Sequence, residues 1–160
     1  MQKLPIGEQN FSEIRQNNAI YIDKTKHLQT MIENGKYYFL SRPRRFGKSL
    51  TISILEAMFQ GRAELFKGLY AEKWVKKQEK NPNPVIKLDM SGLGDYENIK
   101  EFKASLKDYL GEIIYDYNLD IKLKETASRI FANIITRLYK KFGSVVVLMP
   151  YRWIWQTNDR

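Results

Sequence analysis

The feature that most constrains the fold is a glycine–lysine–serine tripeptide, Gly47 to Ser49, that lies between two apolar segments. Residues 36–40, KYYFL, precede it and predict a short buried strand, because they are rich in aromatic residues. The residues after the tripeptide place apolar side chains on one helical face until Gly61, namely Ile54, Leu55, Met58 and Phe59. The sequence therefore predicts a strand, a loop and then a helix that begins near Lys48.

This arrangement suits a phosphate-binding loop. Free backbone N–H groups and the dipole at a helix N-terminus favour anions. A lysine at this position can reach the terminal phosphates of a nucleotide, and a following hydroxyl can ligate Mg²⁺. Lys48 and Ser49 have the required spacing. The competing interpretation is a basic turn before an ordinary helix, since such a tripeptide occurs by chance in roughly one chain in ten of this length.

The entrance to the loop departs from the usual pattern G-x-x-x-x-G-K-[ST]. Arg42 stands where the first glycine is expected, and Pro43 follows it. Because a proline favours an extended conformation for the residue before it, Arg42 is not expected to make the tight turn that a glycine makes there. Three interpretations stay open for Arg42, Arg44 and Arg45, which could add charge near phosphates, contact nucleic acid or be solvated.

Composition limits the classes of function. The chain has 160 residues, 43% of them hydrophobic, which is enough for one domain with a core. It has no cysteine and one histidine, His27, so disulfides, Cys-ligated zinc and multi-histidine metal sites are excluded. No apolar run reaches the ~18 residues of a membrane span, and we expect no membrane partner and a cytoplasmic location. The net charge of +9 favours anionic partners without choosing among them.

The other segments alternate between helical and strand patterns. A helix is expected within residues 21–35, with Asp23 or Thr25 as its cap and Gly35 at its end. A polar turn is expected over Lys76 to Pro84, and the later elements are a strand at 85–92, helices at about 98–117 and 124–141, and a buried strand at 144–149. Strands that alternate with helices predict an α/β fold with a parallel sheet.

Four segments together resemble the predicted AAA-ATPase-like proteins of bacteria and archaea. They are FSEIRQNNAIYIDKT (11–25), YYFLSRPRRFGKSLTISIL (37–55), FQGRAELFKGLY (59–70) and PVIKLDMS (84–91). The resemblance covers Leu4 to about Leu148, and arginine at position 42 is the rule in that family. It implies that residues 1–148 are the N-terminal part of an AAA-like P-loop NTPase domain. The implied fold is part of a three-layer α/β/α arrangement with a mostly parallel sheet, and residues 149–160 form a divergent tail. A PD-(D/E)XK nuclease-like domain usually follows in the family.

The same resemblance implies roles for the loop residues. Lys48 would hold the β- and γ-phosphates of ATP, and Ser49 would ligate Mg²⁺. The whole nucleotide site would comprise Arg42, Pro43, Arg44, Arg45, Phe46, Gly47, Lys48, Ser49 and Leu50. The element Y-I-D-K-T at 21–25 would hold the nucleotide base or dock the strand before the loop, and a helix cap is an equally good interpretation.

The end of the chain departs from the family pattern. In the family an apolar strand is followed by an aspartate that positions Mg²⁺ and a glutamate that polarises the attacking water. Here VVVL (145–148) is followed by MPYRWIWQTNDR, which has no acidic residue before Asp159. Asp89, at the end of an earlier strand, is more typical of a turn. We expect a truncated domain that binds ATP–Mg²⁺ weakly and hydrolyses it very poorly or not at all. No catalytic residue is therefore assigned, and the sequence leaves open whether the chain is an enzyme.

Two alternatives remain from the sequence. The chain could be a basic module that binds nucleic acid through Arg42, Arg44, Arg45, Lys76 and Lys77. Binding of this kind would weaken steeply with salt and would be indifferent to nucleotide. It could also be a remnant without a ligand. The oligomeric state is not determined by the sequence.

Overall fold

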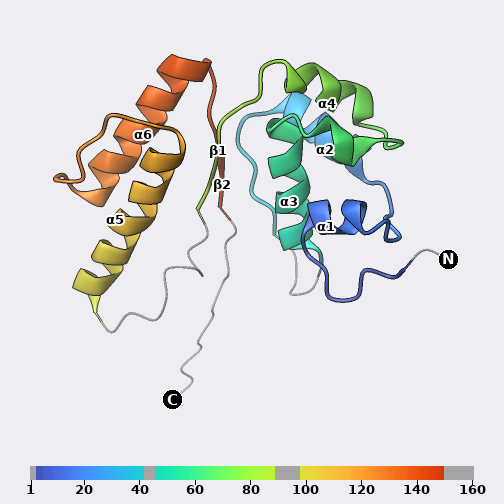
Figure 1. The fold of residues 1–160 in the computed structure, drawn as a ribbon, viewed down its shortest axis with the longest axis horizontal. Helices are drawn as coiled ribbons and strands as arrows, with labels where there is room; N and C mark the ends of the chain where they lie inside the picture. Colours follow the sequence, from blue (N-terminus) through green and yellow to red (C-terminus); the bar gives the residue numbers. More distant parts are fainter. Residues whose placement is uncertain (1–2, 42–45, 89–97, 150–160) are drawn as a thin grey trace. The chain divides into compact units, whose positions relative to one another are not determined.

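The computed structural model describes residues 3–41, 46–88 and 98–149 (Figure 1). The chain divides into two compact units, Met1–Val85 and Ile86–Arg160. The elements in chain order are α1 (Phe11–Gln16), α2 (Thr25–Asn34), α3 (Lys48–Phe59), the 3₁₀ helix η1 (Ala63–Phe66), α4 (Glu72–Glu79), β1 (Val85–Lys87), α5 (Ile99–Asp116), α6 (Ala127–Phe142) and β2 (Val146–Leu148).

The first unit is built around α3, the helix that follows the candidate loop. Phe11 of α1, Met58 of α3 and Phe66 of η1 are fully buried in one core, and the rings of Phe11 and Phe66 have centroids 5.0 Å apart. Helices α1 and α4 both contact α3 (Figure 1). Leu28 and Ile32 of α2 pack against the same core. Burial of these aromatic and aliphatic side chains is the main term that holds α3 in place.

The second unit consists of α5, α6 and the strands β1 and β2. The two helices run in the same direction, with their C-terminal ends together, since the Tyr117 and Phe142 rings lie 6.3 Å apart and Lys141 Nζ donates to the Tyr117 carbonyl. Asn98 caps α5, because its Oδ1 accepts the backbone N–H groups of Lys100 and Glu101. Strands β1 and β2 pair in parallel.

The structure confirms the expected helices at α2, α3, α5 and α6 and the strands at β1 and β2. It therefore supports a mixed α/β class with a small parallel sheet. The three-layer P-loop arrangement stays a prediction, and so does the division into a domain at 1–148 and a tail at 149–160. No helix in the described part of the chain has the length and apolar character that a membrane span requires.

The prediction of a buried strand at 36–40 is wrong. These residues belong to no strand, and their side chains are exposed, at 94% for Tyr37 and 75% for Phe39. A strand is stable only where its N–H and C=O groups find partners. None of the described segments pairs with this one in a sheet, so its high β-propensity is not realised.

Two further predictions need correction. The polar turn expected over Lys76 to Pro84 begins later, because residues 76–79 complete α4 and Lys76 forms an ion pair with Glu72 one turn earlier. The strand expected to be buried at 144–149 is shorter and only partly buried. It pairs with one neighbour among the described residues, β1. Helix α1, with six residues, η1 and α4 were not predicted.

Candidate functional site

Gly47 forms the N-cap of α3 in a left-handed conformation, with φ 72° and ψ 24°. Apart from its two neighbours in the chain, no described residue has an atom within 4 Å of a Cβ added there. The left-handed backbone conformation therefore favours glycine at this position. The backbone N–H and the hydroxyl of Thr51 both donate to the Gly47 carbonyl, each at 2.9 Å. The chain thus turns sharply at Gly47 and enters the helix at once.

Lys48 and Ser49 are the first two residues of α3. Their N–H groups lie in the first turn, where no intrahelical acceptor exists. The first turn carries no acidic side chain, so no carboxylate there opposes an anion. Ser49 is exposed and Lys48 is partly buried. This arrangement can offer backbone N–H groups, an ammonium group and a hydroxyl to a phosphate.

Of the other residues expected at the site, the structure describes some and not others. Phe46 is 65% exposed, and Leu50 packs against the core of the first unit, where it anchors the start of α3. Four members of the expected site lie outside the described residues, namely Arg42, Pro43, Arg44 and Arg45. Asp89 and the segment 150–160 also lie outside them. Among the described residues no group of three His, Asp or Glu could hold a metal ion. The Ser49 hydroxyl is the group to test as a ligand of Mg²⁺.

Hydrogen bonds connect helix α1 to α3 and to the segment around η1. The Phe11 N–H donates to Ser53 Oγ on α3 at 2.9 Å. Arg15 donates through Nε to the Leu65 carbonyl at 2.8 Å and through Nη2 to the Lys67 carbonyl at 2.6 Å. One guanidinium group therefore satisfies two carbonyls around η1, which a single-point lysine ammonium could not do in the same geometry.

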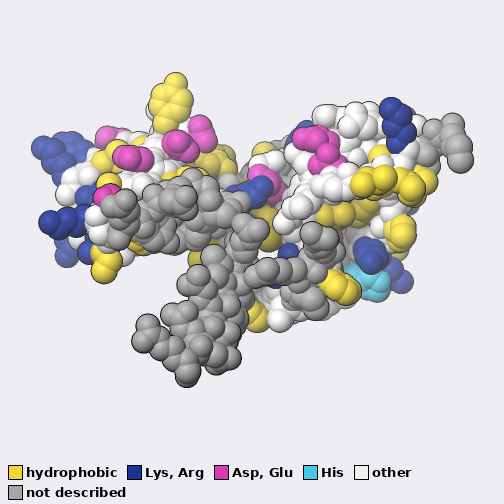
Figure 2. All heavy atoms as spheres, turned by 90° about the horizontal axis from the view of Figure 1, so that it is seen from below, with side chains coloured by type: hydrophobic (Ala, Val, Ile, Leu, Met, Phe, Trp, Pro, Cys, Tyr) yellow, Lys and Arg dark blue, Asp and Glu magenta, His cyan; other side chains and the backbone are white. Residues whose placement is uncertain are grey.

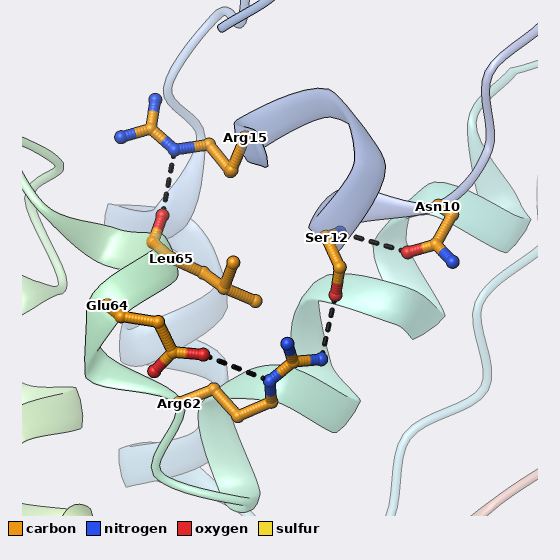
Figure 3. Close-up of polar contacts among 6 residues, drawn as sticks. All are labelled: Asn10, Ser12, Arg15, Arg62, Glu64 and Leu65. Atoms are coloured by element: carbon orange, nitrogen blue, oxygen red, sulfur yellow. Dashed lines mark hydrogen bonds and ion pairs between the residues drawn. The ribbon is translucent and has the colours of Figure 1, made fainter. Parts of the chain in front are cut away.

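A second set of contacts joins α1 to the segment after α3 (Figure 3). Arg62 Nη1 donates to Ser12 Oγ at 2.8 Å, while its Nε lies 3.2 Å from Glu64 Oε1. Ser12 is itself held because its N–H donates to Asn10 Oδ1, the N-cap of α1. Serine, arginine and glutamate thus connect segments that lie fifty residues apart in the sequence.

Asp23 links the start of α2 to the turn after η1. Its Oδ1 accepts the N–H and the hydroxyl of Thr25, and its Oδ2 accepts the Tyr70 N–H at 2.7 Å. Thr25 is fully buried, and its Oγ1 accepts the Ala71 N–H. Partial burial acts to raise the pKa of Asp23, but the hydrogen bonds from Tyr70 and Thr25 outweigh it and hold the pKa below its ordinary value.

These contacts explain much of the Y-I-D-K-T element. The N-cap of α2 is Lys24, not Asp23 or Thr25 as expected, and its side chain makes no capping hydrogen bond. Asp23, one position earlier, accepts the N–H of Thr25. The ring of Tyr21 contacts Phe11 edge-on at 5.3 Å, and burial, together with the charge of Asp23, raises the pKa of Tyr21 to about 12. The strand that this element was expected to dock does not form. Contact with a nucleotide base stays a prediction.

Sequence reasoning did not single out Ser12, Arg15, Ser53 or Arg62. All four lie inside the segments on which the family resemblance rests, at 11–25, 37–55 and 59–70. The structure brings these three segments together around α3. The signal in the sequence that could have indicated these contacts was the family resemblance itself, because it extends over all three segments.

Comparison with known proteins agrees with this picture. The family described as "Predicted AAA-ATPase" matches residues 5–150. An uncharacterized protein in the vnfD 5′ region of Azotobacter chroococcum mcd 1 is 34% identical over 151 residues, which is 92% of this chain and 28% of that protein. The chain therefore spans less than a third of the length of that relative. No solved structure matches. The chain belongs to the family of predicted AAA-ATPases.

Proposed function

We propose that this chain binds ATP with Mg²⁺ through residues 42–50 and the N-terminus of α3. The observation that carries the proposal is the left-handed Gly47 directly before Lys48 and Ser49, at the first turn of a helix whose opposite face is buried. In this arrangement the N–H groups of the first turn would face the phosphates. Lys48 would hold the β- and γ-phosphates, and Ser49 would ligate Mg²⁺.

The scaffold around α3 supports the proposal physically. A phosphate site works only if its donors stay in place, because donors that must first be ordered lose much of their binding energy. The contacts of α1 with Ser53 and the burial of Ile54 and Met58 hold α3 from its other side. The family, described as a predicted AAA-ATPase, fits a nucleotide as the ligand.

We further propose that hydrolysis by this chain is slow. The sequence after β2 continues Met149-Pro150-Tyr151 and supplies no carboxylate where the family pattern has an aspartate and a glutamate. Loss of a general base lowers a rate by about 10²- to 10⁴-fold. We expect ATP turnover to be lower than that of a family member with both acids by a factor in this range.

The finer architecture belongs to the same proposal. Residues 1–148 would form the N-terminal part of an AAA-like P-loop domain in a three-layer α/β/α arrangement, and 149–160 a divergent tail. In the longer relatives, ATP binding and hydrolysis would drive a conformational change of the whole protein. A cytoplasmic location and a nucleotide partner follow from this function.

The test is a thermal-unfolding titration with Mg-ATP on the wild type, Lys48→Ala and the control Lys80→Ala, which removes an exposed lysine at the end of α4. At a ligand concentration about 100 times Kd, binding adds about 2.7 kcal/mol of stability. For a chain of this size that corresponds to a rise in Tm of roughly 5 to 11 °C. We expect this rise in the wild type and in Lys80→Ala, and its loss in Lys48→Ala.

A second variant separates the metal from the phosphates. Ser49→Ala should keep binding of ATP without Mg²⁺ and lose the extra stabilisation that Mg²⁺ brings. A wild type that melts cooperatively and shows no response to Mg-ATP would overturn the proposal. Equal responses of Lys48→Ala and Lys80→Ala would show that ATP binds elsewhere.

A further inference from the structure

Helix α5 carries its charges in an unusual order. Lys100, Lys103 and Lys107 occupy its first half, at spacings of three and four residues, and Glu101 is the one acid in that half. At about 100° per residue these side chains share an arc of about 60°. The acids of the second half, Asp108, Glu112 and Asp116, recur every four residues on a flank roughly 150° away around the helix. The lysines therefore form one row, separated from the acids.

This order opposes the physical preferences of an isolated helix. Cations are disfavoured near a helix N-terminus and anions near the C-terminus. Like charges three or four residues apart also repel. Among the described residues the ion pairs are Arg62–Glu64 and Lys76–Glu72, both in the first unit, so no described carboxylate pairs with the lysines of α5. A helix that breaks both rules on one flank points to a role for that flank outside the fold.

The connection between α5 and α6 carries two more lysines close to α5. Leu123 packs on α5 at Gly111, where a Cβ would lie 3.3 Å from Leu123 Cδ1. Gly111 is one turn after Lys107 on the same side of the helix. The neighbours of Leu123 in the chain are Lys122 and Lys124, and both are exposed.

We name Lys100, Lys103, Lys107, Lys122 and Lys124 the lysine face. Figure 2 shows Lys and Arg side chains on the second unit, with Asp and Glu side chains close to them. The acids next to this face in the sequence are Glu101, Asp108, Asp120 and Glu125, of which Glu101 accepts a hydrogen bond from Asn98 and Glu125 one from Asn133. Glu101 and Asp108 each lie about 100° around the helix from the lysine that precedes them, so the row of Lys100, Lys103 and Lys107 itself contains no acid.

We propose that the lysine face binds the phosphate backbone of nucleic acid without reading base sequence. A row of lysines suits a regular polyanion, because each neutralised phosphate releases condensed counterions and this release drives binding. An acidic protein offers no such release, and exposed ion pairs contribute little by themselves. A membrane surface would need an exposed apolar face on the same helix, whereas Leu110 and Ile113 of α5 are buried in the core of the second unit.

This surface differs from the one expected from the sequence. Of the two described lysines proposed there, Lys76 is already paired with Glu72. The lysine face is also independent of the proposed ATP site, because it lies in the other unit. Failure of either proposal would leave the other intact.

The test is fluorescence anisotropy with a labelled duplex DNA of mixed sequence, on the full chain. The lysine-face variant carries Lys100→Gln, Lys103→Gln and Lys107→Gln. The matched control carries Lys73→Gln, Lys77→Gln and Lys80→Gln, which remove three exposed lysines from the α4 region and leave the same net charge. Because the substitutions in α5 relieve repulsion between like charges, that variant is expected to fold, and a thermal melt verifies this.

The expected result is a change in salt dependence. Five phosphate contacts lower the affinity about 500-fold between about 50 and 200 mM salt, whereas the two that remain in the lysine-face variant lower it about 12-fold. The control should behave as the wild type does. Equal loss in both variants would show that net charge alone binds DNA and would overturn the proposal. Absence of DNA binding by the wild type would also overturn it. So would a result in which the lysine-face variant binds DNA as the wild type does and loses binding to vesicles that contain phosphatidylserine.

Discussion

Gly61 shows how conformation and space can both select one residue. It follows α3 with a φ of 67°, which is in the left-handed region. A Cβ added there would lie 2.7 Å from both Cα and N of Glu79 at the end of α4. That distance is too short for any side chain, and the atoms in the way are backbone. The close approach of these two segments therefore depends on glycine.

We expect Gly61→Ala to destabilise the first unit more than Gly68→Ala does. Gly68 has a φ of 79° but open space around a Cβ, so its substitution costs only the left-handed strain of about 1–2 kcal/mol. Gly61→Ala adds the overlap with Glu79, which costs about a further 1–3 kcal/mol. Urea unfolding of the two variants measures the difference. Equal midpoints would show that α4 moves away at no cost.

At the scale of elements, Asp23 acts as a connector. Its carboxylate accepts donors from the first residue of α2 and from Tyr70, which follows η1. These two segments are 47 residues apart in the sequence. Because the folded state holds the pKa of Asp23 below its unfolded value, the carboxylate stabilises the fold wherever it is ionised in both states.

The pH dependence follows with a definite sign. The stabilisation by Asp23 is fully present above about pH 4, the ordinary pKa of an aspartate, and it disappears as the pH falls through the lowered pKa of the folded state. Asp23→Asn should therefore lower the free energy of unfolding near neutral pH and show a weaker loss of stability in acid. Urea midpoints of both proteins against pH provide the measurement. Glu33→Gln is the control, because Glu33 is exposed and its hydrogen bond to Gln29 lies within α2. It should leave the decrease in stability at low pH as it is in the wild type.

The elements also differ in how well the sequence predicts them. Helices α3, α5 and α6 have 12 to 18 residues and a repeating apolar face, which local periodicity reveals. Helix α1 has six residues, too few for a periodic signal, and it is held by Arg15 and Phe11 through contacts with distant segments. The prediction of a strand at 36–40 was wrong because strand formation requires a partner that local sequence does not identify.

At the scale of the whole molecule, the segment Tyr37 to Leu40 is an association hazard. It presents four consecutive large hydrophobic side chains to solvent, and none of the described segments pairs with it. Exposed residues of high β-propensity favour pairing between chains. We expect concentration-dependent association that Phe39→Lys suppresses, because a charge in such a segment disfavours pairing.

Light scattering against protein concentration measures this effect. Tyr115→Lys is the matched control, since Tyr115 is 85% exposed but lies at the end of α5, outside that segment. It adds the same charge to the chain. If both variants raise the concentration at which association begins by the same amount, net charge is the cause and the segment 37–40 is not.

The sequence by itself determined the longer helices, the strand–helix–helix–strand order of the second unit, the glycine before Lys48 and the family. These depend on local patterns, because the apolar face of a helix and the turn at a glycine are specified by neighbours in the chain. Only the tertiary structure decided that Arg15 binds carbonyls around η1, that Asp23 joins Tyr70 and that Tyr37 stays exposed. Each of these depends on which distant segments meet, and hydrogen-bond partners far apart in the chain leave no periodic mark on a single sequence.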